Sequence, residues 1–477
     1  MLKKAIRWIL SCSLVLSTNS AVWAQGEVNQ SEIETLKQRV RELEEQNRAI
    51  LALLNELKVQ MANKPVQVAA RTDESKDAVK GAKDVTPATV ARKEPAQKEA
   101  RQDDVVRWKE LSAGESRLRF YGFLRLDLIA DDSRPDNSQI PFFVRSEDSL
   151  VGLRDQSDFT LHPRLTRIGI DYFGPNISGL GDAELSGKFE VDFQNGGRES
   201  RPIIRIRHAY LKSSWGALSL LAGQTWDIIS PLYPTVNNDT LMWNAGNLGD
   251  RRGQIRLSYE PKVGAGTVSL VGGIGLTGAI DALDLDNDGV RDGENSAKPN
   301  LQARVGVSHP LWNKQTKVSL GVSGHYGWME TVSRLAGRDD FRSQSLSVDY
   351  NLALHDRLAI QGEGWFGRNL SDFRGGVGQA INTALGTEIR SRGGWAELAF
   401  KLNRYYSIYP GYTIDDPTDR DIPNQGRVKN RAWYVVNRFR PGGPFLVGID
   451  YLRWTTDYKG LERGTDNRVN LYLQYSF

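Results

Sequence analysis

The stretch Asn467-Arg-Val-Asn-Leu-Tyr-Leu-Gln-Tyr-Ser-Phe477 alternates apolar and polar side chains without a break. Successive side chains of an extended strand point to opposite faces, so one face is apolar and the other is polar. The apolar face holds Val469, Leu471, Leu473, Tyr475 and Phe477, and the polar face holds Arg468, Asn470, Tyr472, Gln474 and Ser476. An edge strand of a soluble sandwich is the alternative, but such a strand rarely ends on an aromatic residue. The pattern therefore predicts a strand that lies between lipid and a wet interior.

Similar alternation recurs upstream, in segments of roughly ten residues that are separated by turn signals. In 117–128 and 183–194, charged or polar side chains occupy nearly every second position. A buried unpaired charge is costly in a dry core, whereas water in a lumen keeps it solvated. The sequence from 106 to 477 therefore predicts an all-β fold, a transmembrane antiparallel β-barrel around a water-filled pore.

Counting these segments gives about 16 strands, the size class of water-filled channels. The expected strands are 117–130, 164–173, 183–194, 202–212, 217–226, 253–260, 265–274, 300–309, 316–328, 343–354, 357–368, 389–402, 404–414, 428–439, 444–457 and 467–477. Longer loops are expected near 131–158, 227–250, 275–298, 370–388 and 415–427. Short turns lie between them, as a barrel with both termini on one side requires.

The first residues, 1–24, have the pattern of a secretory signal peptide. Lys3, Lys4 and Arg7 precede an apolar run that is too short to span a bilayer. Val22-Trp-Ala24 supplies the small residues of a cleavage site, so we expect cleavage after it. Cys12, the only cysteine, lies inside this segment, which leaves the mature chain without disulfides or cysteine metal sites.

After a short leader, 25–31, residues 32–61 predict a coiled coil that joins several chains. Apolar residues recur at the a and d positions of about four heptads. The a positions are Ile33, Val40, Asn47, Leu54 and Met61, and the d positions are Leu36, Leu43, Ile50 and Leu57. β-Branched a residues and the core Asn47 favour a dimer, whereas Leu51 and Leu53 widen the apolar stripe and favour three or more chains. One amphipathic helix that packs on its own protein is the alternative.

Residues 62–105 mix Lys, Glu, Asp, Ala, Val and Pro without apolar periodicity. Such a segment cannot bury enough apolar surface to offset its ordering entropy. We therefore expect a disordered periplasmic linker between the coiled coil and the barrel.

This order of signal, coiled coil, charged linker and barrel resembles the DcaP-like trimeric porins of Gram-negative outer membranes. Short stretches also look like that family, namely Gly187-Lys-Phe-Glu-Val-Asp-Phe193, Arg205-Ile-Arg-His-Ala-Tyr210, Ala222-Gly-Gln-Thr-Trp226 and Arg392-Gly-Gly-Trp395. The resemblance implies an outer-membrane porin, a homotrimer with one pore per subunit, that passes small organic anions such as dicarboxylates. It also implies that the barrel-assembly machinery reads the final aromatic residue, here Phe477.

The lumen chemistry is expected to involve arginine, which outnumbers lysine roughly three to one in the barrel segment. A guanidinium holds a carboxylate through two parallel hydrogen bonds and keeps its charge, so inward arginines favour anions. The candidate pore-lining residues are Arg119, Arg125, Arg167, Arg205, Arg207 and Arg256, opposed by Glu184, Glu190 and Asp192. Inward placement of Arg205 and Arg207 depends on a bulge near His208. Ion pairs that only brace the wall are the alternative.

The loop at 227–250 is the expected constriction element. It is long and carries Leu241, Met242 and Trp243 among small polar residues. In 16-stranded porins the third outer loop folds into the lumen, and the resemblance implies the same here. An ordinary exposed loop is the alternative.

Asp284-Leu-Asp-Asn-Asp-Gly289 matches the D-x-D-x-D-G pattern of a calcium loop, in which glycine lets alternate carboxylates converge on one cation. The expected ligands are Asp284, Asp286, Asp288 and Asp292. Asn295 replaces the usual glutamate at the last position, so the bidentate ligand is missing or comes from Glu294. A bound Ca²⁺ would stiffen the loop; transport itself requires no cofactor. An acidic, solvated loop is the alternative.

Composition excludes other classes of function. The hydrophobic fraction is 39%, and no long apolar run follows residue 24, so helical membrane spans are excluded. A net charge of +4 gives no case for nucleic-acid binding. The sequence has no H-E-x-x-H or G-x-S-x-G motif, so we expect no enzyme activity. An envelope tether or adhesin, in which the coiled coil and linker carry the main role, is the alternative to a channel.

Overall fold

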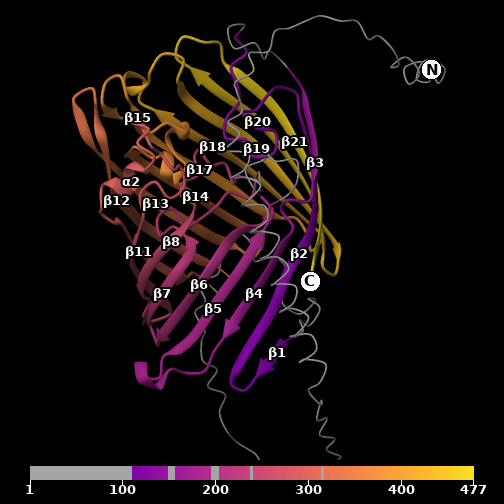
Figure 1. The fold of residues 1–477 in the computed structure, drawn as a ribbon. Coiled ribbons are helices and arrows are strands. Elements are labelled where there is room, and N and C mark those ends of the chain that lie inside the picture. Colours follow the sequence, from indigo (N-terminus) through magenta and orange to yellow (C-terminus); the bar gives the residue numbers. More distant parts are fainter. Residues whose placement is uncertain (1–109, 149–155, 195–202, 237–239, 313–315) are drawn as a thin grey trace, which may run out of the picture. The chain divides into compact units, whose positions relative to one another are not determined.

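The computed structural model describes residues 110–148, 156–194, 203–236, 240–312 and 316–477. The predicted signal peptide (1–24), leader (25–31), coiled coil (32–61) and linker (62–105) lie outside these residues. The structure therefore describes the predicted barrel segment (Figure 1).

The described residues form one large antiparallel sheet and a small two-stranded sheet, β15 with β16. The strands are β1 (Glu110–Ala113), β2 (Ser116–Asp131), β3 (Asp158–His162), β4 (Arg167–Phe173), β5 (Glu184–Asp192), β6 (Arg205–Trp215), β7 (Leu218–Trp226), β8 (Arg251–Tyr259), β9 (Lys262–Val263), β10 (Gly266–Gly275), β11 (Asn300–Pro310), β12 (Lys317–Leu335), β13 (Arg338–His355), β14 (Leu358–Arg368), β15 (Ile381–Asn382), β16 (Thr387–Glu388), β17 (Arg390–Lys401), β18 (Tyr406–Pro417), β19 (Arg427–Gly442), β20 (Phe445–Tyr458) and β21 (Gly464–Ser476). The short helices are η2 (Ser178–Leu180), α2 (Asp292–Asn295), η3 (Ser371–Phe373), η4 (Gly376–Gly378) and η5 (Asp419–Asp421).

The large sheet closes on itself, because its first long strand pairs with its last. β2 pairs with β21 from Phe123 opposite Ser476 to Asp131 opposite Arg468. Beyond that register, the backbones of Gly122 and Phe477 exchange hydrogen bonds of 3.2 and 3.0 Å. β3 and β4 both pair with β2 and act as one interrupted strand, and β1 and β9 only extend hairpins. The described residues thus form a closed barrel of 16 strands, which confirms the predicted fold.

The two faces of the wall differ in polarity as the C-terminal stretch predicts. Leu473 is 52% exposed on the outer face, whereas Asn470 and Arg468 are each 1% exposed inside. Other outward residues are also apolar, such as Val305 and Leu257. A closed barrel with an apolar outer face satisfies all its backbone groups and suits a bilayer. Among the described helices, none has the length and apolar character needed to cross a membrane.

Two of the predicted strands differ clearly from those of the structure. The expected break between 328 and 343 is absent, since β12 and β13 continue as a hairpin to a turn at Ala336 and Gly337. The end of this hairpin extends beyond the apolar band of the wall and therefore carries charged residues. These charges interrupt the apolar alternation from which the strands were predicted. The second strand begins earlier than predicted, as β3, and is interrupted at 163–166.

The main apolar cluster lies inside the barrel. Val236, Met242 and Ala245 from the loop between β7 and β8 pack with Tyr434 and Trp454 from the inner wall. A water-filled cylinder would leave these residues exposed, so the cluster shows that loops enter the lumen and pack there.

Candidate functional site

The described parts of the loop 227–250, which are 227–236 and 240–250, line the inside of the barrel rather than its exterior. Ile229, Met242 and Leu248 are fully buried, and Trp243 is 2% exposed. The Ile228 N–H donates to Gln302 Oε1 of β11 at 2.7 Å. The prediction that this loop folds into the lumen is therefore confirmed.

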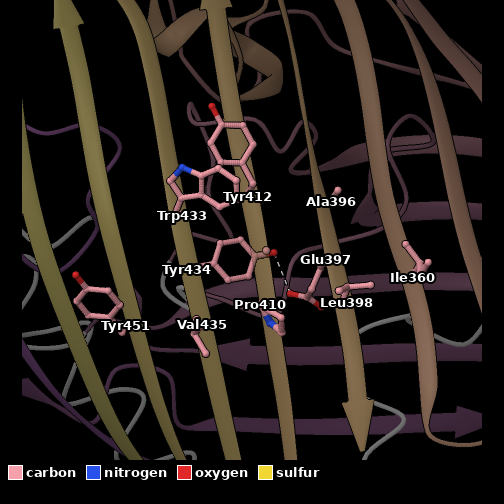
Figure 2. Close-up of a pocket in the computed structure, with 11 residues that line it drawn as sticks. Ile360, Ala396, Glu397, Leu398, Pro410, Tyr412, Trp433, Tyr434, Val435 and Tyr451 are labelled. Carbon is pink, nitrogen blue, oxygen red and sulfur yellow. Dashed lines mark hydrogen bonds between the residues drawn. The ribbon is translucent and has the colours of Figure 1, made fainter.

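Carboxylates on the inner wall of β14 and β17 hold the backbone of this loop. The Leu232 N–H donates to Glu363 Oε1 at 2.7 Å. The Thr235 N–H donates to Glu397 Oε2 at 2.9 Å, and the Thr235 hydroxyl donates to the same oxygen. Tyr434 Oη also donates to Glu397, at 3.0 Å (Figure 2). Glu363 and Glu397 therefore hold the loop in place.

A groove of about 470 Å³ opens on the outer side of the same wall (Figure 2). Trp433, Tyr412 and Tyr451 line it, together with Ala396 and Pro410. These side chains point away from the lumen, so the groove is a dent in the outer face and not part of the pore.

On the other side of the loop, arginines of β4 and β6 meet the carboxylates of β5. Arg207 Nε lies 2.6 Å from Glu190 Oε1, and its Nη1 lies 3.1 Å from Asp192 Oδ2. Arg205 Nη2 lies 2.7 Å from the same oxygen of Asp192, and Arg167 Nε lies 3.5 Å from Glu190. The register shifts between Glu190 and its neighbour, which confirms a bulge beside Arg207. The structure thus brings together five of the predicted pore-lining residues.

Two further arginines continue this network under the loop. Arg251 Nη2 lies 3.6 Å from Asp250, and Arg374 Nε lies 2.8 Å from the same carboxylate. Trp226 lies between these two groups of arginines. The guanidinium carbon of Arg251 lies 4.2 Å from the centre of the Trp226 ring, and that of Arg207 lies 5.9 Å from the same point. Within the described residues, Arg251 Nη1 is buried and has no hydrogen-bond partner.

We call this set the arginine cluster. Its members are Arg167, Arg205, Arg207, Arg251 and Arg374, with Glu190, Asp192 and Asp250. Arg205 and Arg374 keep 27% and 23% of their side-chain surface exposed, so part of the cluster is accessible to solvent. The named arginines outnumber the named carboxylates.

The remaining predicted pore-lining residues do not join the arginine cluster. Arg119 Nη2 pairs with Asp171 at 2.6 Å, and Arg125 pairs with Asp127 at 2.6 Å. Arg256 bonds Gln254 Oε1 at 2.8 Å, and Glu184 is exposed at the far end of β5. Arg119 and Arg125 therefore have the geometry of wall-bracing ion pairs.

Sequence reasoning missed Arg251 and Arg374. Arg251 and Arg252 are consecutive charges, which break the strand alternation, so the predicted strand began two residues late at 253. Arg374 lies in the loop after β14, where periodicity gives no direction to a side chain. The consecutive arginines before an alternating segment were the one available signal.

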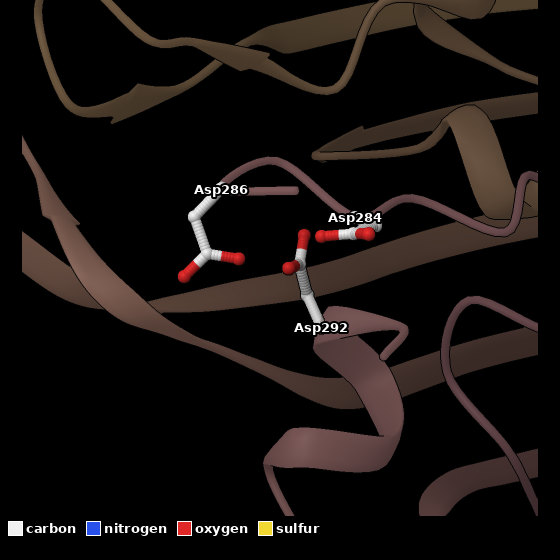
Figure 3. A group of neighbouring side chains, drawn as sticks. All are labelled: Asp284, Asp286 and Asp292. Atoms are coloured by element: carbon white, nitrogen blue, oxygen red, sulfur yellow. The ribbon is translucent and has the colours of Figure 1, made fainter. Parts of the chain in front are cut away.

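The acidic loop after β10 brings three of its four predicted ligands together. Carboxylate oxygens of Asp284, Asp286 and Asp292 lie within 4.8 Å of one another (Figure 3). Asp288 stays apart from them and accepts hydrogen bonds from the Val290 N–H and the Asn295 side chain. Burial, with the charges of the neighbouring aspartates, raises the pKa of Asp292 to about 7. Such converging acidic oxygens fit a hard divalent cation such as Ca²⁺.

Comparison with known proteins gives a fold likeness. No family model matches the sequence, and no curated protein matches it. The structure is similar to the outer membrane channel DcaP of Acinetobacter baumannii, with a TM-score of 0.59 and 20% identity over 77% of this chain and 99% of that chain. At this identity the similarity establishes the fold.

Weaker likenesses include other outer-membrane barrels. OmpT of Vibrio cholerae is 14% identical over 77% of this chain and 100% of that chain, with a TM-score of 0.48. An anion-selective porin from Comamonas acidovorans is 12% identical over 76% of this chain and 100% of that chain, also with a TM-score of 0.48. These two are too distant to support an argument.

Proposed function

We propose that this protein is an outer-membrane porin, a passive diffusion channel for small hydrophilic solutes that favours organic anions such as dicarboxylates. A closed 16-stranded barrel with an apolar exterior and a charged interior supports a channel. The fold likeness to an outer membrane channel supports the location.

The observation that carries the anion preference is the arginine cluster, whose positive charges exceed its carboxylates. Guanidinium groups remain charged at any physiological pH and bind carboxylates through paired hydrogen bonds. Arg205 and Arg374 offer exposed surface for such a contact. A solute with two carboxylates would bind more favourably, because each carboxylate would contact one of these arginines.

Permeation measurements test this function. Liposomes that hold the purified protein should swell faster in succinate than in an uncharged sugar of similar size, because the arginine cluster attracts the anion. Single channels in a planar bilayer should conduct in groups of three. A tether or adhesin predicts no swelling and no steps, and that result would overturn the channel.

We also propose a homotrimer with one pore in each subunit. Each chain closes its own barrel, so a subunit needs no partner strand to complete its wall. The resemblance to trimeric porins favours this assembly, with the coiled coil in the periplasm and Phe477 recognised by the barrel-assembly machinery. Light scattering of the full chain in detergent should give the mass of three chains, and a monomer mass would contradict the proposal.

A bound calcium ion is a separate proposal for the acidic loop. Asp284, Asp286 and Asp292 converge as Ca²⁺ ligands do, and the Ser333 N–H bonds Asp286 Oδ2 at 2.6 Å. A cation there would connect the loop to the hairpin of β12 and β13. Its role would be to stiffen the outer loops.

A further inference from the structure

Arg252 at the start of β8 uses every hydrogen-bond donor of its guanidinium. Its Nε and Nη2 donate to the two carboxylate oxygens of Asp227 at 2.6 and 3.1 Å. Its Nη1 donates to Asp372 Oδ2 at 2.6 Å and to the Leu276 carbonyl at 2.9 Å. Nη2 also donates to the Asp372 carbonyl at 2.9 Å. A guanidinium carries five N–H donors, so this one is saturated.

These contacts join three separate loops. Asp227 is the first residue of the loop 227–250, and Leu276 is the first residue after β10. Asp372 lies in η3, within the loop between β14 and β17, and its Oδ1 accepts the Ile280 N–H at 2.8 Å. The ring of Phe373 lies 3.9 Å from the guanidinium carbon. One side chain therefore holds the bases of the inward loop and of both neighbouring loops.

We propose that Arg252 is a positioning residue that fixes the loop 227–250 in the lumen by joining its base to the two neighbouring loops, and thereby sets the width of the pore. This inference rests on the proposed channel function. Arg252 has no exposed side-chain surface and does not contact the solute; it acts through the loops.

The electrostatics of the site explain why the loops depend on this residue. Asp227 and Asp372 are nearly fully buried, and Arg252 lies between them. Removing one partner of a buried ion pair leaves an uncompensated charge. Without Arg252 the two carboxylates would repel each other, and the loops would move apart to hydrate them.

Arg304 provides a matched control. It is also an inward, largely buried arginine, and it pairs with Asp349 at 2.9 and 2.6 Å. Its partner belongs to β13, so the pair lies within the wall. Arg304→Gln therefore removes the same charge but no hydrogen bond that Arg304 donates to a loop.

Single-channel recording compares Arg252→Gln with Arg304→Gln. The Arg252 variant should show higher conductance, by about 1.5-fold or more, and larger open-channel noise, because a displaced loop widens the constriction. Asp372→Asn, which keeps Arg252, should give the same change to a smaller degree. Equal conductance and noise in the Arg252 and Arg304 variants would overturn the proposal.

A disulfide test reports the loop position without any current. Ser230 Oγ of the inward loop lies 3.4 Å from Ser347 Oγ of β13, and Cys12 of the predicted signal segment is the only natural cysteine. Ser230→Cys with Ser347→Cys should oxidise readily with Arg252 in place and about threefold more slowly in Arg252→Gln, since disulfide geometry is narrow. Equal oxidation rates would overturn the positioning role. Absence of current in every variant would instead remove the channel function, so the two failures are distinguishable.

Discussion

The two inner surfaces on either side of the loop 227–250 use charge in opposite ways. On β14 and β17, Glu363 and Glu397 accept hydrogen bonds from the loop backbone. The arginine cluster, on β4, β5, β6 and β8 with Asp250 and Arg374 added from loops, has more arginines than carboxylates, and Arg205 and Arg374 keep exposed side-chain surface. The sequence alternation is similar on both surfaces, so the position of a charge shows that it faces inward but not what it does.

The difference is set by what each charge meets. The loop presents N–H donors to one wall, and these donors satisfy carboxylates but not guanidinium groups. The carboxylates on that side therefore bind the loop backbone and do not face the solute. The lumen beside the opposite wall is left with a positive excess, which is the basis of the proposed anion preference.

Breaking the carboxylate side should have the largest effect. Glu397→Leu would leave the Thr235 N–H, the Thr235 hydroxyl and Tyr434 Oη without an acceptor. We expect the free energy of unfolding to fall by about 3 kcal/mol, since each unsatisfied buried donor costs about 1–3 kcal/mol. Urea unfolding in vesicles, followed by tryptophan fluorescence, measures it. The control is Glu397→Gln, which keeps an acceptor; equal loss in both variants would contradict this assignment.

Breaking the arginine side should change permeation instead of stability. The double variant Arg251→Gln and Arg374→Gln removes two positive charges beside Asp250. We expect the ratio of succinate to sugar swelling rates to fall by about threefold, because less positive charge faces the lumen. Arg119→Gln, which removes one member of a wall ion pair with Asp171, should change this ratio much less. A larger effect from Arg119 would place the selective site elsewhere.

Removing one carboxylate from the arginine cluster should increase the preference for anions. Asp192 pairs with both Arg205 and Arg207, so Asp192→Asn raises the positive excess. We expect the succinate to sugar ratio to rise by about twofold or less. Glu363→Gln removes a charge of the same sign from the opposite surface, where the loop covers it. That variant should leave the ratio nearly unchanged, and an equal rise in both would show that the two surfaces are equivalent.

The calcium loop should show the smallest effect. Calorimetry should detect Ca²⁺ binding to the purified protein, and Asp286→Asn should weaken it about tenfold, because one hard oxygen ligand loses its charge. Binding should also weaken as the pH falls below about 7, since Asp292 must lose its proton to act as a ligand. Asp288→Asn is the control, because that carboxylate lies outside the group. If Asp286→Asn still bound Ca²⁺ tightly, the three aspartates would be an acidic loop without a specific ion site.

The wall of the barrel could be predicted from the sequence alone. β21 follows a period of two from Arg468 to its end at Ser476, and it closes the barrel against β2. Periodicity of this kind survives because lipid on one side and polar groups on the other act on every residue. The same reasoning found the bulge beside Arg207, where the alternation slips.

The lumen was less predictable because its contacts join segments far apart in the chain. The sequence favoured Arg119 and Arg125, which are strongly periodic, but the structure pairs them with Asp171 and Asp127 of the wall. Arg251 and Arg252 were passed over because two consecutive charges break the period. A charge in a loop gains its role only from the wall it meets after folding.

The most direct test of the central claim is the zero-current potential of the wild-type channel across a bilayer that separates concentrated from dilute potassium chloride. If the arginine cluster leaves a positive excess in the lumen, chloride should cross faster than potassium, and the dilute side should become negative. A dilute side that becomes positive would mean that cations cross faster. That result would contradict the account, because the carboxylates assigned to the inward loop would then be the charges that face the solute.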